Sequence, residues 1–183
     1  MSEQIALAVA ALRDGWIIAY PTESVFGLGC DPHSRAACER LFALKLRPAG
    51  QGVLLIASEF EQVEPYIGSA SDAALARAHA TWPGPQTWVF PRSDRVPAWI
   101  AGAHTGIALR VTAHPVAAEL CHAFGGALVS TSANRHGQAP LRDAVAVRAT
   151  FGDDVAVVVD GSLGGLERPT PIGDAMTGEL LRR

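Results

Sequence analysis

Short, nearly continuous apolar runs recur along this chain, and segments with helical periodicity separate most of them. The runs lie at 16–20, 53–56, 107–111, 127–129 and 155–159. A strand that is apolar at almost every position is covered on both faces, as strands in an α/β sheet are. Alternation of such strands with helices along a chain predicts the α/β class.

The remaining elements refine this prediction. Helices are expected at 2–13, 34–46, 59–66, 71–80, 115–124 and 141–151, with a single turn at 97–100. Ser2, Ser34 and Ser71 are suited to cap three of these helices, because a serine hydroxyl accepts from the first free amides. Further strands are expected at 87–90, 170–175 and 179–181, and the last two are joined at Thr177-Gly178. This closing hairpin predicts a mixed β-sheet with flanking helices.

The length of 183 residues, without a repeat or a linker, predicts one domain spanning 1–183. The net charge is −3, so a nucleic-acid partner would need a local basic patch. The three cysteines form no CxxC pair, which predicts reduced thiols and neither a disulfide framework nor a zinc site. No run approaches the roughly 18 apolar residues of a membrane span. The N-terminus also lacks a basic region, so a cytoplasmic protein is expected.

The stretch 127–140 combines a buried strand with an abrupt change to polar residues. The apolar run ends at Val129, and Ser130, Thr131, Ser132 and Asn134 follow. Small hydroxyls at a strand end can donate to and accept from a ligand, but the same residues also make ordinary turns. A second stretch of similar design at 17–31 favours the ligand-binding interpretation.

Polar side chains at the ends of apolar segments form the candidate site. They are Thr22, Glu23 and Ser24; Lys45 and Arg47; Thr87; Arg110 and Thr112; and Ser130 to Asn134. Arg110 is the most informative of them, because an arginine inside the apolar strand IALRV is costly to bury without an anion. Its partner is either a carboxylate of the protein or a carboxylate or phosphate of a ligand, and the sequence leaves both open.

Lys45 and Arg47 follow at the end of a predicted helix, where the helix dipole alone favours cations by about 0.3–1 kcal/mol each. A functional role would require that they reach an anion such as a polyphosphate. No histidine stands in an obvious base role beside the serines, and the six histidines lack metal-ligand spacing. Such residues predict a site that positions an anionic ligand and stabilises charge.

Several motifs in combination resemble the YrdC-like family, over about 20–182. They are YPTESVFGLGCDP, LKLRP, WPGPQTWVFP, IALRVTAHP, LVSTSAN and PIGDAMTGELLR. The resemblance implies an open, twisted α/β sheet with a wide concave groove. It also implies a nucleotidyltransferase that joins L-threonine, bicarbonate and ATP into threonylcarbamoyl-adenylate and pyrophosphate. That product serves threonylcarbamoyladenosine formation at tRNA position 37, with partner proteins completing the transfer.

The resemblance also implies roles for individual residues. Threonine would be held by Thr22, Arg110 and Thr170. Lys45 and Arg47 would face the ATP phosphates and act in catalysis. The rest of the ATP site would comprise Gln51, Thr87, Thr112, Ser130, Ser132 and Asn134. Mg²⁺ is expected to accompany ATP, with no protein ligand identified for it.

Three residues, Gln51, Pro171 and Gly173, depart from the family pattern, which puts their contribution to the site in question. The alternative function is a YrdC-like module that binds RNA or regulates another protein without adenylate chemistry. Weak tRNA binding by the groove is left open under either reading. The net negative charge and the absence of an RNA-binding signature count against a dedicated RNA module.

Overall fold

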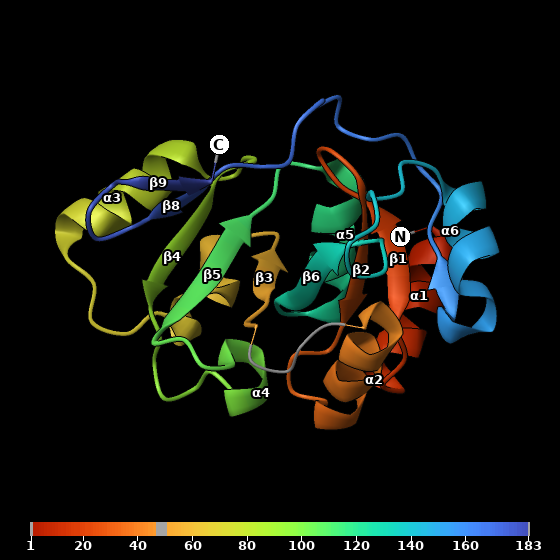
Figure 1. Cartoon of the computed structure of the whole chain (residues 1–183). Helices are drawn as coiled ribbons and strands as arrows, with labels where there is room; N and C mark the ends of the chain where they lie inside the picture. Colours follow the sequence, from red (N-terminus) through yellow and green to blue (C-terminus); the bar gives the residue numbers. More distant parts are fainter. Residues whose placement is uncertain (1, 47–50, 183) are drawn as a thin grey trace.

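A computed structural model describes residues 2–46 and 51–182. Within them, nine strands form one sheet in the order β7-β1-β2-β6-β3-β5-β4-β8-β9, with helices packed around it (Figure 1). The strands are β1 Ile18–Pro21, β2 Phe26–Cys30, β3 Leu54–Ala57, β4 Thr87–Pro91, β5 Gly106–Val111, β6 Leu128–Ser132, β7 Val157–Val158, β8 Ile172–Asp174 and β9 Leu180–Arg182. The α-helices are α1 Glu3–Arg13, α2 Arg35–Lys45, α3 Asp72–Thr81, α4 Ala98–Ala101, α5 Pro115–Phe124 and α6 Ala144–Phe151.

The sheet is mixed, as the closing hairpin predicted. β1 and β7, β3 and β5, and β4 and β8 run parallel. The other neighbouring pairs are antiparallel, including the β8–β9 hairpin, in which Gly178 adopts a positive φ of 81°. The α/β class and the flanking helices expected from the sequence are therefore confirmed.

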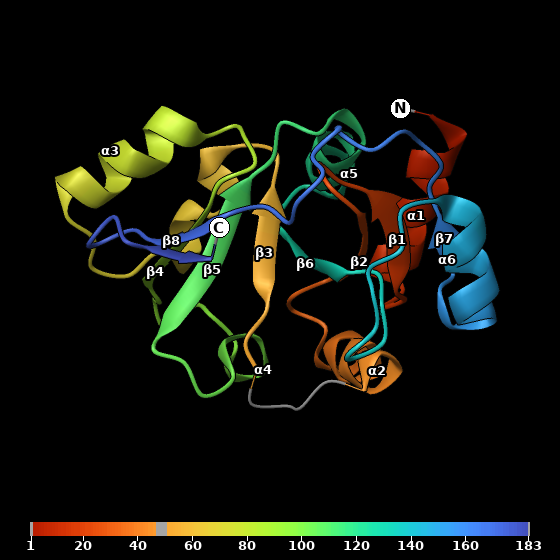
Figure 2. The ribbon, with the colours of Figure 1, turned by 45° about the horizontal axis from the view of Figure 1, so that its top comes forward.

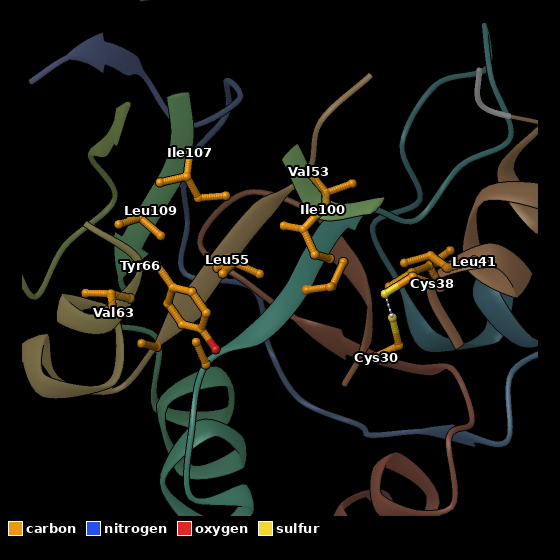
Figure 3. Close-up of a cluster of buried hydrophobic side chains, with 14 of the residues drawn as sticks. Cys30, Cys38, Leu41, Val53, Leu55, Val63, Tyr66, Ile100, Ile107 and Leu109 are labelled. Atoms are coloured by element: carbon orange, nitrogen blue, oxygen red, sulfur yellow. Dashed lines mark hydrogen bonds between the residues drawn. The ribbon is translucent and has the colours of Figure 1, made fainter. Parts of the chain in front are cut away.

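Two hydrophobic clusters fix the layers. On one face, α1 and α5 pack against β1, β3 and β6, where residues such as Tyr20, Ile56 and Leu128 are fully buried. The larger cluster, which includes residues of α2, α3, α4 and α6, contains Leu41, Leu55 and Ile100 (Figure 3). Because consecutive strand residues point to opposite faces, Leu55 and Ile56 belong to different clusters.

The serine caps are present as expected. The side chains of Ser2, Ser34 and Ser71 accept from backbone amides at the starts of α1, α2 and α3. The helix expected from 141 begins instead at Ala144, because Asp143 caps it by accepting from Ala146 N at 2.7 Å.

Other boundaries differ from the expectation. The helix expected at 59–66 is two 3₁₀ turns, Phe60–Gln62 and Glu64–Tyr66, because Pro65 lacks the amide that a continuous helix needs. Of the run 155–159, only Val157–Val158 pairs as a strand. β6 extends through Ser132, so Ser130 to Ser132 are the last residues of the strand. They are strand residues because β2 pairs along this whole stretch and β3 pairs at Ser130.

A long connection crosses the sheet after β7. β7 lies at one edge and the β8–β9 hairpin at the other, and the segment between them runs along one end of the molecule (Figures 1 and 2). It is tied to the β1–β2 turn by Gly164 N, which donates to Thr22 O at 3.0 Å, and by Leu166 N, which donates to Glu23 O at 2.9 Å. This crossing brings Thr170 to the middle of the sheet, near residues from the first quarter of the chain.

Candidate functional site

A cavity of about 820 Å³ lies over the sheet and is open to solvent. Its apolar lining includes residues of β2, β3, β4 and β5. Its polar lining comes from segments far apart in the sequence: Thr22, Ser24, Thr87, His104, Thr105, Arg110, Ser130, Thr131, Ser132, Thr170, Asp174 and Arg182. The cavity is thus a largely apolar groove that also carries several hydroxyls and two arginines, and it has the size typical of small-molecule sites.

Strand register explains why these residues meet. Leu54 of β3 is paired with Ser130 of β6 on one side and with Ala108 of β5 on the other. Directly opposite residues share a face of the sheet, and so do residues two positions apart. Arg110 and Ser132 therefore lie on the same face as this row. Arg110 is paired with Ile56, which belongs to the cluster that α1 and α5 cover.

Arg110 is the central charge of the groove and is only 4% exposed. Its Nη1 donates to Thr170 Oγ1 at 2.6 Å and to Thr87 Oγ1 at 3.4 Å. Its Nη2 lies 3.6 Å from Glu23 Oε2, while its Nε has no hydrogen-bond partner among the described residues. Burial lowers the pKa of the guanidinium, and Glu23 acts in the opposite direction. The sequence left open whether the partner of Arg110 is a carboxylate of the protein or an anion of a ligand. The structure is compatible with both, since Arg110 has Glu23 beside it and also lines the cavity.

The β1–β2 turn supplies both a cavity wall and that carboxylate. Thr22 closes the turn, because its N and Oγ1 both donate to Val25 O, at 3.1 and 2.7 Å. Thr22 and Ser24 line the cavity, whereas Glu23 does not. Glu23 accepts a hydrogen bond from Thr112 Oγ1. Thr112, an expected ATP contact, lines neither this cavity nor the smaller one described next.

A smaller cavity of about 110 Å³ adjoins the first. It is lined by Lys45, Gln51, Thr131, Ser132, Asn134, His136 and Gly137. Thr131 and Ser132 line both cavities, so the end of β6 is their common wall. The structure thus separates the expected site residues into two adjoining groups, one around Arg110 and one around Lys45.

Lys45 is buried at the end of α2 and donates to the segment that follows β6. Its Nζ donates to Ser132 O, to Asn134 O at 2.8 Å and to Asn134 Oδ1 at 3.1 Å. Ser132 Oγ also donates to Asn134 Oδ1, at 2.6 Å. The ammonium therefore shapes the wall between the cavities as well as adding positive charge there. Arg47 lies outside the described residues.

Arg182 is a lining residue that sequence reasoning missed. Its Nη2 donates to Thr170 O at 2.7 Å, and its pKa is lowered by burial and by the nearby charge of Arg110. The signal in the sequence was the arginine that ends the motif PIGDAMTGELLR. With it, two guanidinium groups, one from β5 and one from β9, contact the single residue Thr170.

The donor set fits an anion better than a resident metal ion. Residues 2–46 and 51–182 contain no group of three or more His, Cys, Asp or Glu side chains arranged to hold a metal. Asp174 lines the larger cavity, but its Oδ1 already accepts from Met176 N and Thr177 N, at 2.8 and 2.9 Å. In this same part of the chain, no helix is both long and apolar enough to cross a membrane.

Comparison with known proteins identifies the family of the chain. The family model Sua5_yciO_yrdC, described as "Telomere recombination", matches residues 10–183. A protein of Coxiella burnetii (strain RSA 493 / Nine Mile phase I) named threonylcarbamoyl-AMP synthase is 51% identical over 181 residues, which are 99% of this chain and 97% of that protein. A protein of Halorhodospira halophila (strain DSM 244 / SL1) with the same name is 53% identical over 176 residues, 96% of this chain and 92% of that protein.

Among solved structures, the fold is similar to that of P. abyssi Sua5 complexed with L-threonine. The TM-score is 0.89 at 31% sequence identity, and the match covers 95% of this chain and 52% of that one. The chain therefore spans about half the length of this structural relative, and nearly the full length of the two sequence relatives.

Proposed function

The chain belongs to the Sua5/YciO/YrdC family, and on that basis we propose that it is a threonylcarbamoyl-AMP synthase. It converts L-threonine, bicarbonate and ATP into threonylcarbamoyl-adenylate and pyrophosphate. The observation that carries this proposal is Arg110, a buried guanidinium on the wall of a cavity that also carries the hydroxyls of Thr22 and Thr170. A cation in that setting suits the carboxylate of an amino acid.

The proposed contacts of threonine are Arg110, Thr22 and Thr170. All three line the larger cavity. A guanidinium can bind a carboxylate with two parallel hydrogen bonds, which fixes the orientation of the amino acid as well as its charge. The hydroxyls of Thr22 and Thr170 complete a polar wall around the bound substrate.

ATP is proposed to lie between Arg110 and the smaller cavity. Lys45 and Arg47 lie at the end of α2 or just beyond it, and we assign them to the phosphates and to catalysis. The other proposed ATP contacts are Gln51, Thr87, Ser130, Ser132 and Asn134. Arg182 joins this set because it lines the cavity. Thr112 is left out, since its hydroxyl is used by Glu23.

The chemistry needs position and charge neutralisation. The amine of threonine first attacks the carbon of bicarbonate, and water leaves to give threonine carbamate. An oxygen of the carbamate then attacks the α-phosphorus of ATP, the bond from that phosphorus to the bridging oxygen of the β-phosphate breaks, and pyrophosphate leaves with the electron pair. No protein nucleophile is required, and the cations of the groove oppose the charge that develops on the phosphates. Mg²⁺ is proposed to enter with ATP and to be held largely by the phosphates.

The product supports formation of threonylcarbamoyladenosine at position 37 of tRNA, with further proteins completing the transfer. We propose that 1–183 acts as one catalytic domain in the cytoplasm. Weak contact of the groove with tRNA is compatible with this role, although the net charge of −3 gives no general attraction to RNA.

Pyrophosphate release from ATP is the decisive test. Release should require both L-threonine and bicarbonate, and Arg110→Ala should abolish it while circular dichroism shows a folded protein. Arg148→Ala is a matched control, because Arg148 pairs with Asp160 on the surface, where both side chains are about half exposed. Release that is independent of threonine would refute the assignment.

A further inference from the structure

We propose that Glu23 is a positioning residue that fixes the guanidinium of Arg110 for carboxylate binding. The inference rests on the proposed function, because it takes the ligand of Arg110 to be the threonine carboxylate. Glu23 does not line the cavity and acts from behind Arg110. It is the only buried carboxylate among the residues that the structure describes.

The contacts of Arg110 are divided between its two terminal nitrogens. Nη1 is held by the hydroxyls of Thr170 and Thr87, and Nη2 faces Glu23 Oε2 at 3.6 Å. Hydroxyls on one nitrogen alone leave the planar group free to pivot about that nitrogen. The charge of Glu23 on the other side restrains this rotation. The third nitrogen, Nε, is buried and has no hydrogen-bond partner among the described residues, so it does not restrain the rotation.

Glu23 is itself held from two directions. Thr112 Oγ1 donates to Glu23 Oε1, and Thr112 Oγ1 in turn accepts from His114 N at 3.0 Å. The backbone oxygen of Glu23 accepts from Leu166 N in the segment that crosses the sheet. Among residues 2–46 and 51–182, its Oε2 has no hydrogen-bond partner and contacts Arg110 through the ion pair. A carboxylate fixed in this way can set the orientation of the cation that it faces.

The two possible roles of Glu23 predict opposite changes in the binding of a carboxylate when Glu23 is removed. If Glu23 only contributed charge, its removal would make the groove more positive and would strengthen binding of an anionic group. If Glu23 positions Arg110, its removal lets the guanidinium turn away, and the preference for a carboxylate falls. We expect the second effect to prevail, because charge-assisted hydrogen bonds depend steeply on geometry.

The experiment compares L-threonine with L-threoninamide, which lacks the carboxylate, by calorimetric titration. The preference of wild type for L-threonine should fall by about tenfold in Glu23→Gln, equivalent to about 1.4 kcal/mol, with threoninamide binding and ATP binding unchanged. Thr112→Val removes the hydroxyl that fixes Glu23 and should act in the same direction, whereas Thr112→Ser should resemble wild type. Glu39→Gln controls for the loss of one negative charge and should leave the preference unchanged, because Glu39 forms an exposed pair with Arg35.

The outcomes separate the inference from the function that it assumes. An unchanged or increased preference in Glu23→Gln would overturn the positioning role. Loss of ATP affinity in Thr112→Val would also count against it, since Thr112 would then contact the nucleotide. If wild type itself does not prefer L-threonine over its amide, the assignment of Arg110 to the carboxylate fails first. Should Glu23→Gln fail to fold, the comparison of Thr112→Val with Thr112→Ser decides.

Discussion

Arg110 Nη1 donates to Thr170 Oγ1 at 2.6 Å across a separation of 60 positions in the sequence. This bond joins the C-terminal end of β5 to the segment that enters β8. Thr170 O also accepts from Arg182, so one threonine connects both guanidinium groups of the groove. The placement of Arg110 therefore depends on the last third of the chain.

Thr170→Val tests this bond. The substitution keeps the shape of the side chain but removes the acceptor from a buried cation, and hydrogen bonds to charged groups contribute about 1.5–3 kcal/mol. We expect the KM for L-threonine in pyrophosphate release to rise by about tenfold or more. Thr170→Ser retains the hydroxyl and should stay near wild type, and equal values in the two variants would show that the bond has no role in threonine binding.

Lys45→Met should affect stability as well as turnover. Its Nζ donates to Ser132 O and to two oxygens of Asn134, and these acceptors would lose a charged donor. We expect the free energy of unfolding to fall by about 2–3 kcal/mol, measured by urea denaturation with tryptophan fluorescence. A variant as stable as wild type but inactive would assign Lys45 to the phosphates alone.

Gly173→Ala should disturb the β4–β8 pairing. A Cβ at Gly173 would lie 2.5 Å from Cζ3 of Trp88, whose ring is fixed by Nε1 donating to Thr81 Oγ1 at 2.9 Å. Overpacking of this kind costs about 1–3 kcal/mol, and we expect a lower melting temperature and a higher KM for L-threonine. Gly126→Ala is the control, because its nearest atoms, in Phe124, are 4.0 Å away. Equal melting temperatures in the two variants would contradict the prediction.

Cys121 should make the protein sensitive to alkaline pH. Burial raises the pKa of its thiol from 9.0 to about 12, and Sγ donates to Ile56 O at 3.4 Å. Since the folded state holds the proton more tightly than the unfolded state, stability is complete below pH 9 and falls as pH rises toward 12, by at most about 1.4 kcal/mol per pH unit. Cys121→Ala should flatten the fall in unfolding free energy measured between pH 9 and 10.5. Parallel curves for wild type and variant would exclude this contribution.

Much of the fold follows from local signals. Apolar runs located strands such as β3 and β5, and the hydroxyls of Ser2 and Ser71 marked helix starts. The length of β6 did not follow, because Ser130 to Ser132 become strand only through pairing with β2 and β3, and that pairing is not encoded in their own polarity.

Part of the candidate site could also be predicted from local signals in the sequence, and part could not. Polar residues after apolar runs indicated Thr22, Arg110 and Ser130, and the register of the sheet brings these residues to one cavity. The places of Glu23 and Arg182 around Arg110 and Thr170 were not predictable from their own segments. Glu23 is distinguished by its burial behind Arg110, and Arg182 by the hairpin that returns it to Thr170. Both depend on contacts between distant parts of the chain.

The crossing segment after β7 has a consequence for synthesis. Residues that line the cavity from Thr22 to Ser132 are translated before Thr170 and Arg182. A domain generally folds as a unit. A nascent chain that has not reached Thr170 lacks the hydroxyl to which Arg110 Nη1 donates. A polypeptide cut short before Thr170 would carry most of the residues that line the cavity, but it would lack the contacts that join the two guanidinium groups, and we expect it not to turn over substrate.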